Sequence, residues 1–139
     1  MLKKVLIIVA LILAIAGVLA WKGYQKEASA THQIATGASF QDSLAKPVPK
    51  LVDFGSTHCI PCKKMEPILE ELQREYQGVL EVVFIDTEKY PEYAKQYKIE
   101  LIPTQIFLDP LNQELFRHEG FFPKQDILKK WQDLNISLK

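Results

Sequence analysis

The sequence predicts an α/β domain in which helices flank a central mixed β-sheet. Short apolar runs of strand length alternate with amphipathic helical segments, and two further strand-like runs are separated by one turn before a last helix. Strands joined through a helix run parallel, whereas strands joined by a tight turn run antiparallel. We therefore expect both kinds of pairing within one sheet.

The expected elements follow one another closely from residue 39 onward. Ser39 is a candidate N-cap for the first helix. The longest helix is amphipathic, because apolar side chains recur every three or four positions, and Pro67 should kink it since proline lacks the amide donor. In chain order the elements are a helix at 39–44, a strand at 50–55, the long helix at 61–76, a strand at 79–86, a helix at 90–97, strands at 104–108 and 114–118 around a turn at 111–112, and a helix at 124–134.

An uncharged apolar run occupies residues 5–21. As a helix it would be about 25 Å long, which is at the short end for a membrane span. Lys3 and Lys4 precede the run and favour a cytoplasmic N-terminus, while Trp21 and Tyr24 suit the opposite membrane interface. A cleavable secretory signal has the same layout. A retained membrane anchor and a cleaved signal are therefore both open, as is a buried helix of a soluble domain.

The chain thus divides into an anchor or signal at 1–24, a polar tether at 25–36 and a folded domain at 37–139. An anchor or a signal places this domain outside the cytoplasm, either periplasmic or on the outer face of the membrane, or secreted after cleavage; such compartments permit disulfides. The whole chain has 17 basic and 17 acidic residues, which gives no reason to expect a nucleic-acid partner. No oligomer interface is apparent, and we expect a monomer.

Cys59 and Cys62, separated by Ile60 and Pro61, are the most informative pair in the chain. In a strand–loop–helix setting this spacing is typical of a thiol redox motif. Cys59 would lie at the helix N-terminus, where unpaired amides and the helix dipole favour a thiolate that attacks disulfides. Cys62, one turn further on, is placed to attack the Cys59 sulfur and release the product. Pro61 stiffens the loop and lies in the first turn, where no amide is needed.

Two other uses of the cysteines are open. They are too few for a four-thiolate zinc site, and His32, His58 and His118 are scattered, so no metal is expected. A purely structural disulfide is the second alternative, although so short a loop gives relatively little entropic stabilisation.

Taken together, several motifs resemble the thioredoxin family over residues 38–136. They are Leu51-Val52-Asp53-Phe54, Cys59-Ile60-Pro61-Cys62-Lys63, Pro67, Ile102-Pro103-Thr104 and Gly120. The resemblance implies a thioredoxin fold and a thiol–disulfide oxidoreductase that uses no cofactor besides its redox-active Cys59–Cys62 disulfide.

The resemblance also implies roles for individual residues. Cys59 would be the attacking nucleophile and Cys62 the resolving thiol. Asp53 would be a buried acid that assists proton transfer at Cys62; the alternative is a strand-end carboxylate that is solvated or acts as a cap. Substrate would bind along Ile60, Pro61 and 102–104, with Pro103 preceded by a cis peptide bond and its neighbouring backbone pairing with the substrate as an added strand. An ordinary trans proline is the alternative there.

The chain departs from the thioredoxin pattern at informative positions. His58 stands where tryptophan is usual, and if protonated it would favour the Cys59 thiolate and make the couple more oxidising; an exposed histidine with little effect is the alternative. Val82 and Phe84 stand where the family often places a lysine, so Asp53 is expected to titrate differently. Phe121 and Phe122 are candidates for an apolar rim near the cysteines or for the core.

The expected function is reduction of protein disulfides outside the cytoplasm. Pro61 beside Cys62 resembles the reducing thioredoxins, whereas strongly oxidising relatives usually place histidine there. Such a reductase needs a transmembrane thiol carrier as its electron donor and disulfide-bonded proteins as substrates, with the membrane contacted through residues 5–21. A disulfide-forming oxidase and a non-catalytic binding module are the alternatives.

Overall fold

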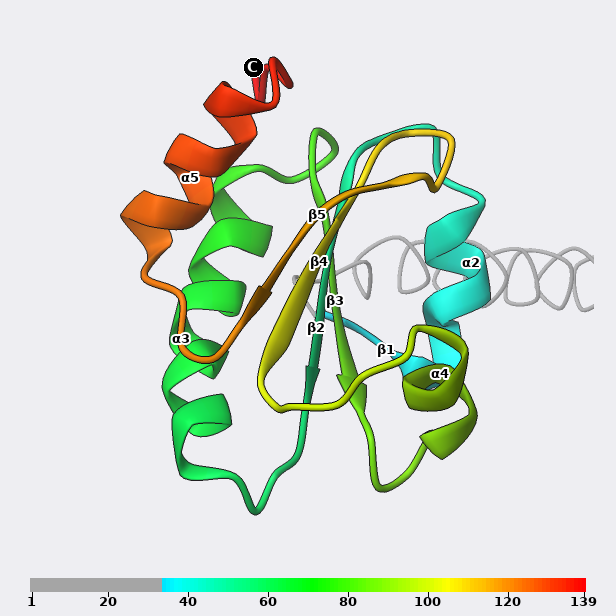
Figure 1. Cartoon of the computed structure of the whole chain (residues 1–139). Helices are drawn as coiled ribbons and strands as arrows, with labels where there is room; N and C mark the ends of the chain where they lie inside the picture. The colour runs from blue at the N-terminus through cyan, green and yellow to red at the C-terminus, as the bar shows by residue number, and fades with distance from the viewer. Residues whose placement is uncertain (1–33) are drawn as a thin grey trace, which may run out of the picture. The chain divides into compact units, whose positions relative to one another are not determined.

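The computed structural model describes residues 34–139, which form a five-stranded mixed sheet with helices on both faces (Figure 1). The membrane anchor or signal and most of the expected tether lie outside the described residues. No helix within 34–139 is long and apolar enough to cross a membrane. The strands are β1 Ala35–Thr36, β2 Lys50–Gly55, β3 Glu81–Asp86, β4 Thr104–Leu108 and β5 Glu114–Glu119, in the spatial order β1-β3-β2-β4-β5.

Both expected kinds of strand pairing occur in this sheet. β1 and β2 run parallel to β3, whereas β2 pairs antiparallel with β4, and β4 with β5. The four strands expected from apolar runs are confirmed. β1 was not expected: two residues are too short to show the alternation that identifies a strand, and Ala35 and Thr36 fall in the range assigned to the tether.

The described helices agree with the expected ones to within a few residues. The ribbon in Figure 1 places α3 and α5 over one face of the sheet and α2 and α4 over the other. The helices are the 3₁₀ turn Gly37–Ser39, then α2 Phe40–Leu44, α3 Ile60–Glu75, α4 Pro91–Gln96 and α5 Lys124–Asp133. Pro67 lies within α3 and does not end the helix.

The expected side-chain cap at Ser39 is wrong. Its hydroxyl makes no capping bond to α2; it accepts from the Thr36 amide at 3.1 Å and donates to the Thr36 carbonyl at 3.2 Å. A 3₁₀ turn precedes α2 directly, so Ser39 hydrogen-bonds within that turn.

The central strand β2 is buried on both faces, and its alternation assigns each side chain to one core. Val52 and Phe54 pack with Phe40 of α2, while Leu51 packs with residues of α3 and α5. Side chains two residues apart on a strand share a face. Asp53 therefore points to the face that α3 covers, in line with Leu51. The α3-side core comprises Leu51, Met65, Leu69, Leu72, Leu80, Val82, Phe107, Phe122, Ile127 and Trp131.

Candidate redox site

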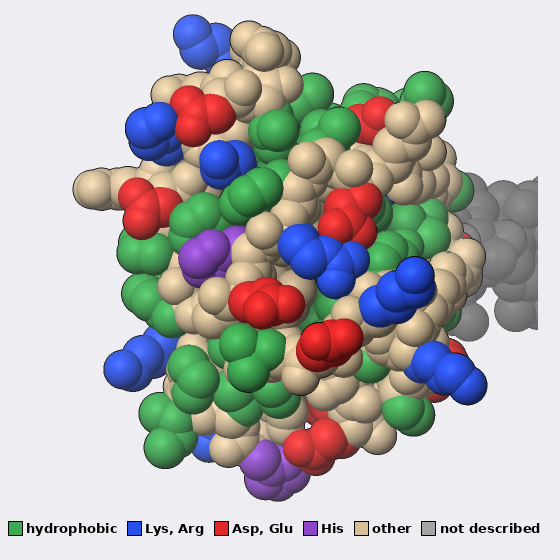
Figure 2. Space-filling view, viewed as in Figure 1, with side chains coloured by type: hydrophobic (Ala, Val, Ile, Leu, Met, Phe, Trp, Pro, Cys, Tyr) green, Lys and Arg blue, Asp and Glu red, His purple; other side chains and the backbone are tan. Residues whose placement is uncertain are grey.

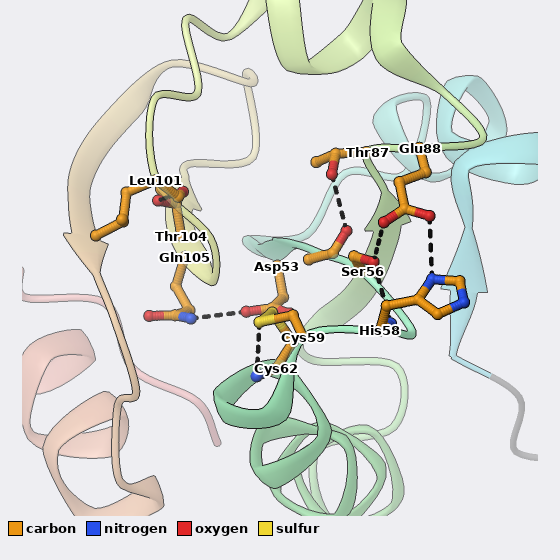
Figure 3. The surroundings of a disulfide bond; sticks show 11 residues. Asp53, Ser56, His58, Cys59, Cys62, Thr87, Glu88, Leu101, Thr104 and Gln105 are labelled. Atoms are coloured by element: carbon orange, nitrogen blue, oxygen red, sulfur yellow. Dashed lines mark hydrogen bonds and ion pairs between the residues drawn. A yellow bond between two sulfur atoms is a disulfide. The ribbon is translucent and has the colours of Figure 1, made fainter.

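A disulfide joins Cys59 and Cys62 at the N-terminus of α3, with their Cα atoms 5.2 Å apart (Figure 3). Cys59 is the N-cap residue, and its sulfur accepts a hydrogen bond from the Cys62 amide at 3.3 Å. Pro61 occupies the first turn, where its missing amide costs nothing. The two cysteines differ in exposure, since Cys62 is buried and Cys59 is half-buried. Only Cys59 is open to a substrate.

Gly55, the last residue of β2, lies directly against Cys62. A Cβ at Gly55 would be 3.2 Å from the Cys62 Cβ, 3.3 Å from its sulfur and 2.9 Å from the Phe84 ring. These distances are shorter than ordinary carbon–carbon contacts. Glycine at this position therefore allows the end of β2 to pack closely against Cys62 and Phe84.

Asp53 is fully buried two residues earlier on the same face of β2. Its Oδ1 accepts a hydrogen bond from Gln105 Nε2 at 2.7 Å, and its Oδ2 has no partner among the described residues. Burial raises the pKa of Asp53 to about 7, and the Gln105 hydrogen bond opposes that rise. A solvated strand-end carboxylate is therefore excluded.

The residue that hydrogen-bonds Asp53 was missed by the sequence analysis. Phe84 is the register neighbour of Asp53 on β3, so no lysine approaches from there, as expected. Gln105 comes instead from β4, the strand on the other side. The antiparallel register of β2 and β4 sets Gln105 opposite Asp53, and the only signal in the sequence was a polar residue within an apolar strand.

The segment 102–104 leads into β4 beside the cysteine loop. The peptide bond between Ile102 and Pro103 is cis, as expected. Thr104 pairs with Phe54 near the end of β2. The buried Pro103 therefore lies near the last residue of β2, where the loop to the cysteines begins. The Pro103 carbonyl accepts a hydrogen bond from the Gly120 amide at 2.7 Å. The start of the β5–α5 connection therefore lies next to Pro103.

Apolar side chains surround this end of the molecule. Ile60, Leu101 and Phe121 are exposed at 72%, 52% and 43%. Figure 2 shows hydrophobic surface near the end that carries the β2–α3 loop, with acidic and basic side chains interspersed elsewhere on the same face. Phe121 and Phe122 were both candidates for an apolar rim or for the core. Phe121 is exposed, whereas Phe122 packs in the α3-side core.

His58 is largely exposed and is held by an acidic residue that sequence reasoning missed. Its Nδ1 lies 3.1 Å from Glu88 Oε2, and Ser56 Oγ donates to Glu88 Oε1 at 2.6 Å (Figure 3). The His58 amide donates in turn to Ser56 Oγ at 3.1 Å. A positive charge on His58 therefore meets the Glu88 carboxylate.

No group of three His, Cys, Asp or Glu side chains within 34–139 is arranged to hold a metal ion. His118 lies on β5, where its Nε2 is 3.3 Å from the Phe121 carbonyl and its ring stacks on Phe122. His58 instead contacts Glu88, and His118 contacts Phe121 and Phe122.

The disulfide, its helix and the buried acid beside it define a thiol–disulfide oxidoreductase, an enzyme that exchanges its own cysteine pair with substrate disulfides. Comparison with known proteins gives the family. The chain matches the thioredoxin family model over residues 31–133 and belongs to the thioredoxin family.

Individual relatives agree with this assignment. The chain is 40% identical over 96 residues to a thioredoxin-like protein of Synechocystis sp., covering 68% of this chain and 90% of the relative. It is 37% identical over 92 residues to a thioredoxin of Staphylococcus aureus, covering 66% and 86%. It is also 40% identical over 96 residues to the chloroplastic thioredoxin Y1 of Arabidopsis thaliana. This alignment covers 68% of this chain and 55% of the plant protein.

Proposed function

We propose that the chain reduces protein disulfides, with Cys59 as nucleophile and Cys62 as resolving thiol. The observation that carries this proposal is the difference in exposure between the two sulfurs at the N-terminus of α3. A substrate reaches Cys59 first, and Cys62 is sheltered until a mixed disulfide has formed. The helix amides stabilise a thiolate at Cys59.

The reaction proceeds in two exchanges. The Cys59 thiolate attacks one substrate sulfur, the substrate S–S bond breaks, and the second substrate sulfur leaves as a thiolate. Cys62 then loses its proton and attacks Cys59. The Cys59–Cys62 bond forms as the bond to the substrate breaks, so two electrons pass from the protein dithiol to the substrate.

Asp53 serves as the acceptor of the Cys62 proton in this proposal. It is buried on the face that carries Cys62, and its pKa of about 7 keeps comparable fractions of acid and carboxylate near neutral pH. A proton acceptor works best when its pKa lies near the working pH. Solvent has little access to Cys62, so an internal acceptor is needed there.

Substrate binds across the exposed side of the same site. Ile60 and Pro61 directly follow Cys59, and the segment 102–104 offers backbone for an extended substrate strand at the same end of the sheet. The apolar side chains around this end provide contact area that is not specific to one sequence.

Two features favour reduction over oxidation. Pro61 precedes Cys62 as in the reducing thioredoxins, and the Glu88 carboxylate offsets positive charge on His58, the feature that would make the couple oxidising. Replacement of Cys59 by Ser should abolish reduction of insulin disulfides by the full chain. Cys62→Ala should retain the first exchange and accumulate mixed disulfides with client proteins, separable on non-reducing gels. Activity in Cys59→Ser, or no adducts with Cys62→Ala, would contradict the assigned roles.

The place of action is a separate part of the proposal. The apolar run 5–21 behind Lys3 and Lys4 supports an anchor at 1–24, which a tether that ends before β1 joins to a domain outside the cytoplasm. Electrons then have to come from a transmembrane thiol carrier. In intact cells, a membrane-impermeant maleimide should label reduced Cys59 in the full chain and fail to label a variant lacking residues 1–24. Equal protection of both proteins would contradict this location.

A further inference from the structure

Gln105 occupies a position where packing alone would favour an apolar side chain. It lies on β4, two residues before Phe107, and faces the α3-side core with no exposed surface. Burying an amide costs free energy unless hydrogen bonds replace those made to water. Gln105 makes one side-chain hydrogen bond among the described residues, from Nε2 to Asp53 Oδ1 at 2.7 Å, and its Oε1 has no partner there.

We propose that Gln105 is a positioning residue for proton transfer at Cys62. Its amide holds the Asp53 carboxyl through Oδ1 and leaves Oδ2 free to receive the proton. The inference rests on the proposed function and names a second residue that the step requires. Gln105 touches neither sulfur in this account; it acts through Asp53.

Among the described residues, Gln105 is the one whose side chain hydrogen-bonds the Asp53 carboxyl group. α3 places the Cys59–Cys62 disulfide against Gly55, two residues from Asp53 on β2, and a disulfide does not titrate. From β3, its register neighbour is Phe84, which carries no charge. From β4 it meets Gln105, whose own neighbour on β5 is His118.

The hydrogen bond acts on one form of the carboxyl group. An N–H donor stabilises the carboxylate over the neutral acid, and so opposes the effect of burial on the Asp53 pKa. Without it, Asp53 would remain protonated to higher pH and accept the Cys62 proton less often. In the step itself, the Cys62 S–H bond breaks and an O–H bond forms at Asp53 Oδ2, before the Cys62 thiolate displaces the substrate sulfur from Cys59.

The first test measures Asp53 directly in the oxidised full chain. Carboxyl ¹³C resonances of labelled aspartate are titrated in the wild type and in Gln105→Met, and Asp53→Asn assigns the signal. We expect the Asp53 midpoint to move up by about one pH unit in Gln105→Met, since hydrogen bonds to charged groups are among the stronger ones. Gln105→Leu also removes the donor, introduces no charge and should likewise move the midpoint upward.

Ile106→Val is the matched control. Ile106 is the next residue on β4, is equally buried and faces the other core, so its truncation loosens packing without touching Asp53. It should leave the Asp53 midpoint in place. An unchanged midpoint in both Gln105 variants, or an equal shift in the control, would overturn the role of Gln105.

The second test measures turnover. The acid limb of the pH–rate profile for insulin reduction should move to higher pH in Gln105→Met, with about a threefold to tenfold loss of rate at pH 6. In an Asp53→Asn background the Gln105 substitution should have no further effect. An independent loss of rate in that background would overturn the inference while leaving the proposed function standing. A wild-type chain that does not reduce insulin would overturn both.

Discussion

Glu88 lies 3.1 Å from the imidazole Nδ1 of His58, although the two residues are 30 positions apart in the chain. The contact matters because His58 directly precedes the cysteine that the proposal makes the nucleophile. A protonated histidine beside a thiol favours the thiolate. The neighbouring carboxylate removes part of that effect, and the same Glu88 is fixed by the Ser56 hydroxyl at 2.6 Å.

Glu88→Gln should therefore make the disulfide more oxidising, because it removes a negative charge from the surroundings of the Cys59 thiolate. We expect the reduction potential at pH 7 to rise by about 10–20 mV, since a charge in an exposed ion pair contributes little. The measurement is equilibration of the full chain with thiol buffers, with Glu92→Gln on the exposed side of α4 as the control. An unchanged potential in Glu88→Gln, or an equal rise in the control, would contradict this role of Glu88.

Gly55→Ala should destabilise the domain through a collision with two neighbours. The added Cβ would lie 2.9 Å from the Phe84 ring and 3.2 Å from the Cys62 Cβ. Overpacking of this kind costs about 1–3 kcal/mol. Urea unfolding of the oxidised protein measures it, with Thr57→Ala in the exposed loop as a control expected near zero.

The double variant with Phe84→Leu gives a check on that explanation. Shortening Phe84 removes the ring atom that the new Cβ would meet, so the combined loss should be smaller than the sum of the two single losses. Strict additivity would mean that the ring is not the obstacle.

Asp53→Asn should change the pH dependence of stability. The pKa of Asp53 is raised from 3.8 to about 7 in the folded state, so between these values the folded state holds more protons than the unfolded chain. The free energy of unfolding of the wild type therefore falls as pH rises from about 4 to 7. The full loss is about 4 kcal/mol.

Asparagine carries no charge and escapes this loss. The Asp53→Asn protein should thus gain stability relative to the wild type on going from pH 4 to pH 8, as measured by urea unfolding of the oxidised proteins. Parallel stability–pH curves would contradict the raised pKa.

The parts of the structure that sequence could predict are those defined by local periodicity. The apolar spacing of α3 and the unbroken apolar run of β2 identify these elements without tertiary information. β1 was missed because Ala35 and Thr36 form a strand only through pairing with β3. Local pattern contains no such signal.

The candidate site divides in the same way. Cys59 and Cys62 are three positions apart, so their meeting at a helix start follows from the sequence. Gln105 meets Asp53 across 52 residues, and Glu88 meets His58 across 30. Those contacts depend on strand order and on where the loop after β3 turns, which composition and spacing do not specify.

The reduction potential of the Cys59–Cys62 pair distinguishes a disulfide reductase from a disulfide-forming oxidase. The full chain is equilibrated with glutathione and dithiothreitol buffers, and the dithiol fraction is read by alkylation. The proposed reductase predicts a value near that of thioredoxin, about −270 mV. A value of about −120 mV, typical of a strong disulfide-forming oxidant, would contradict it.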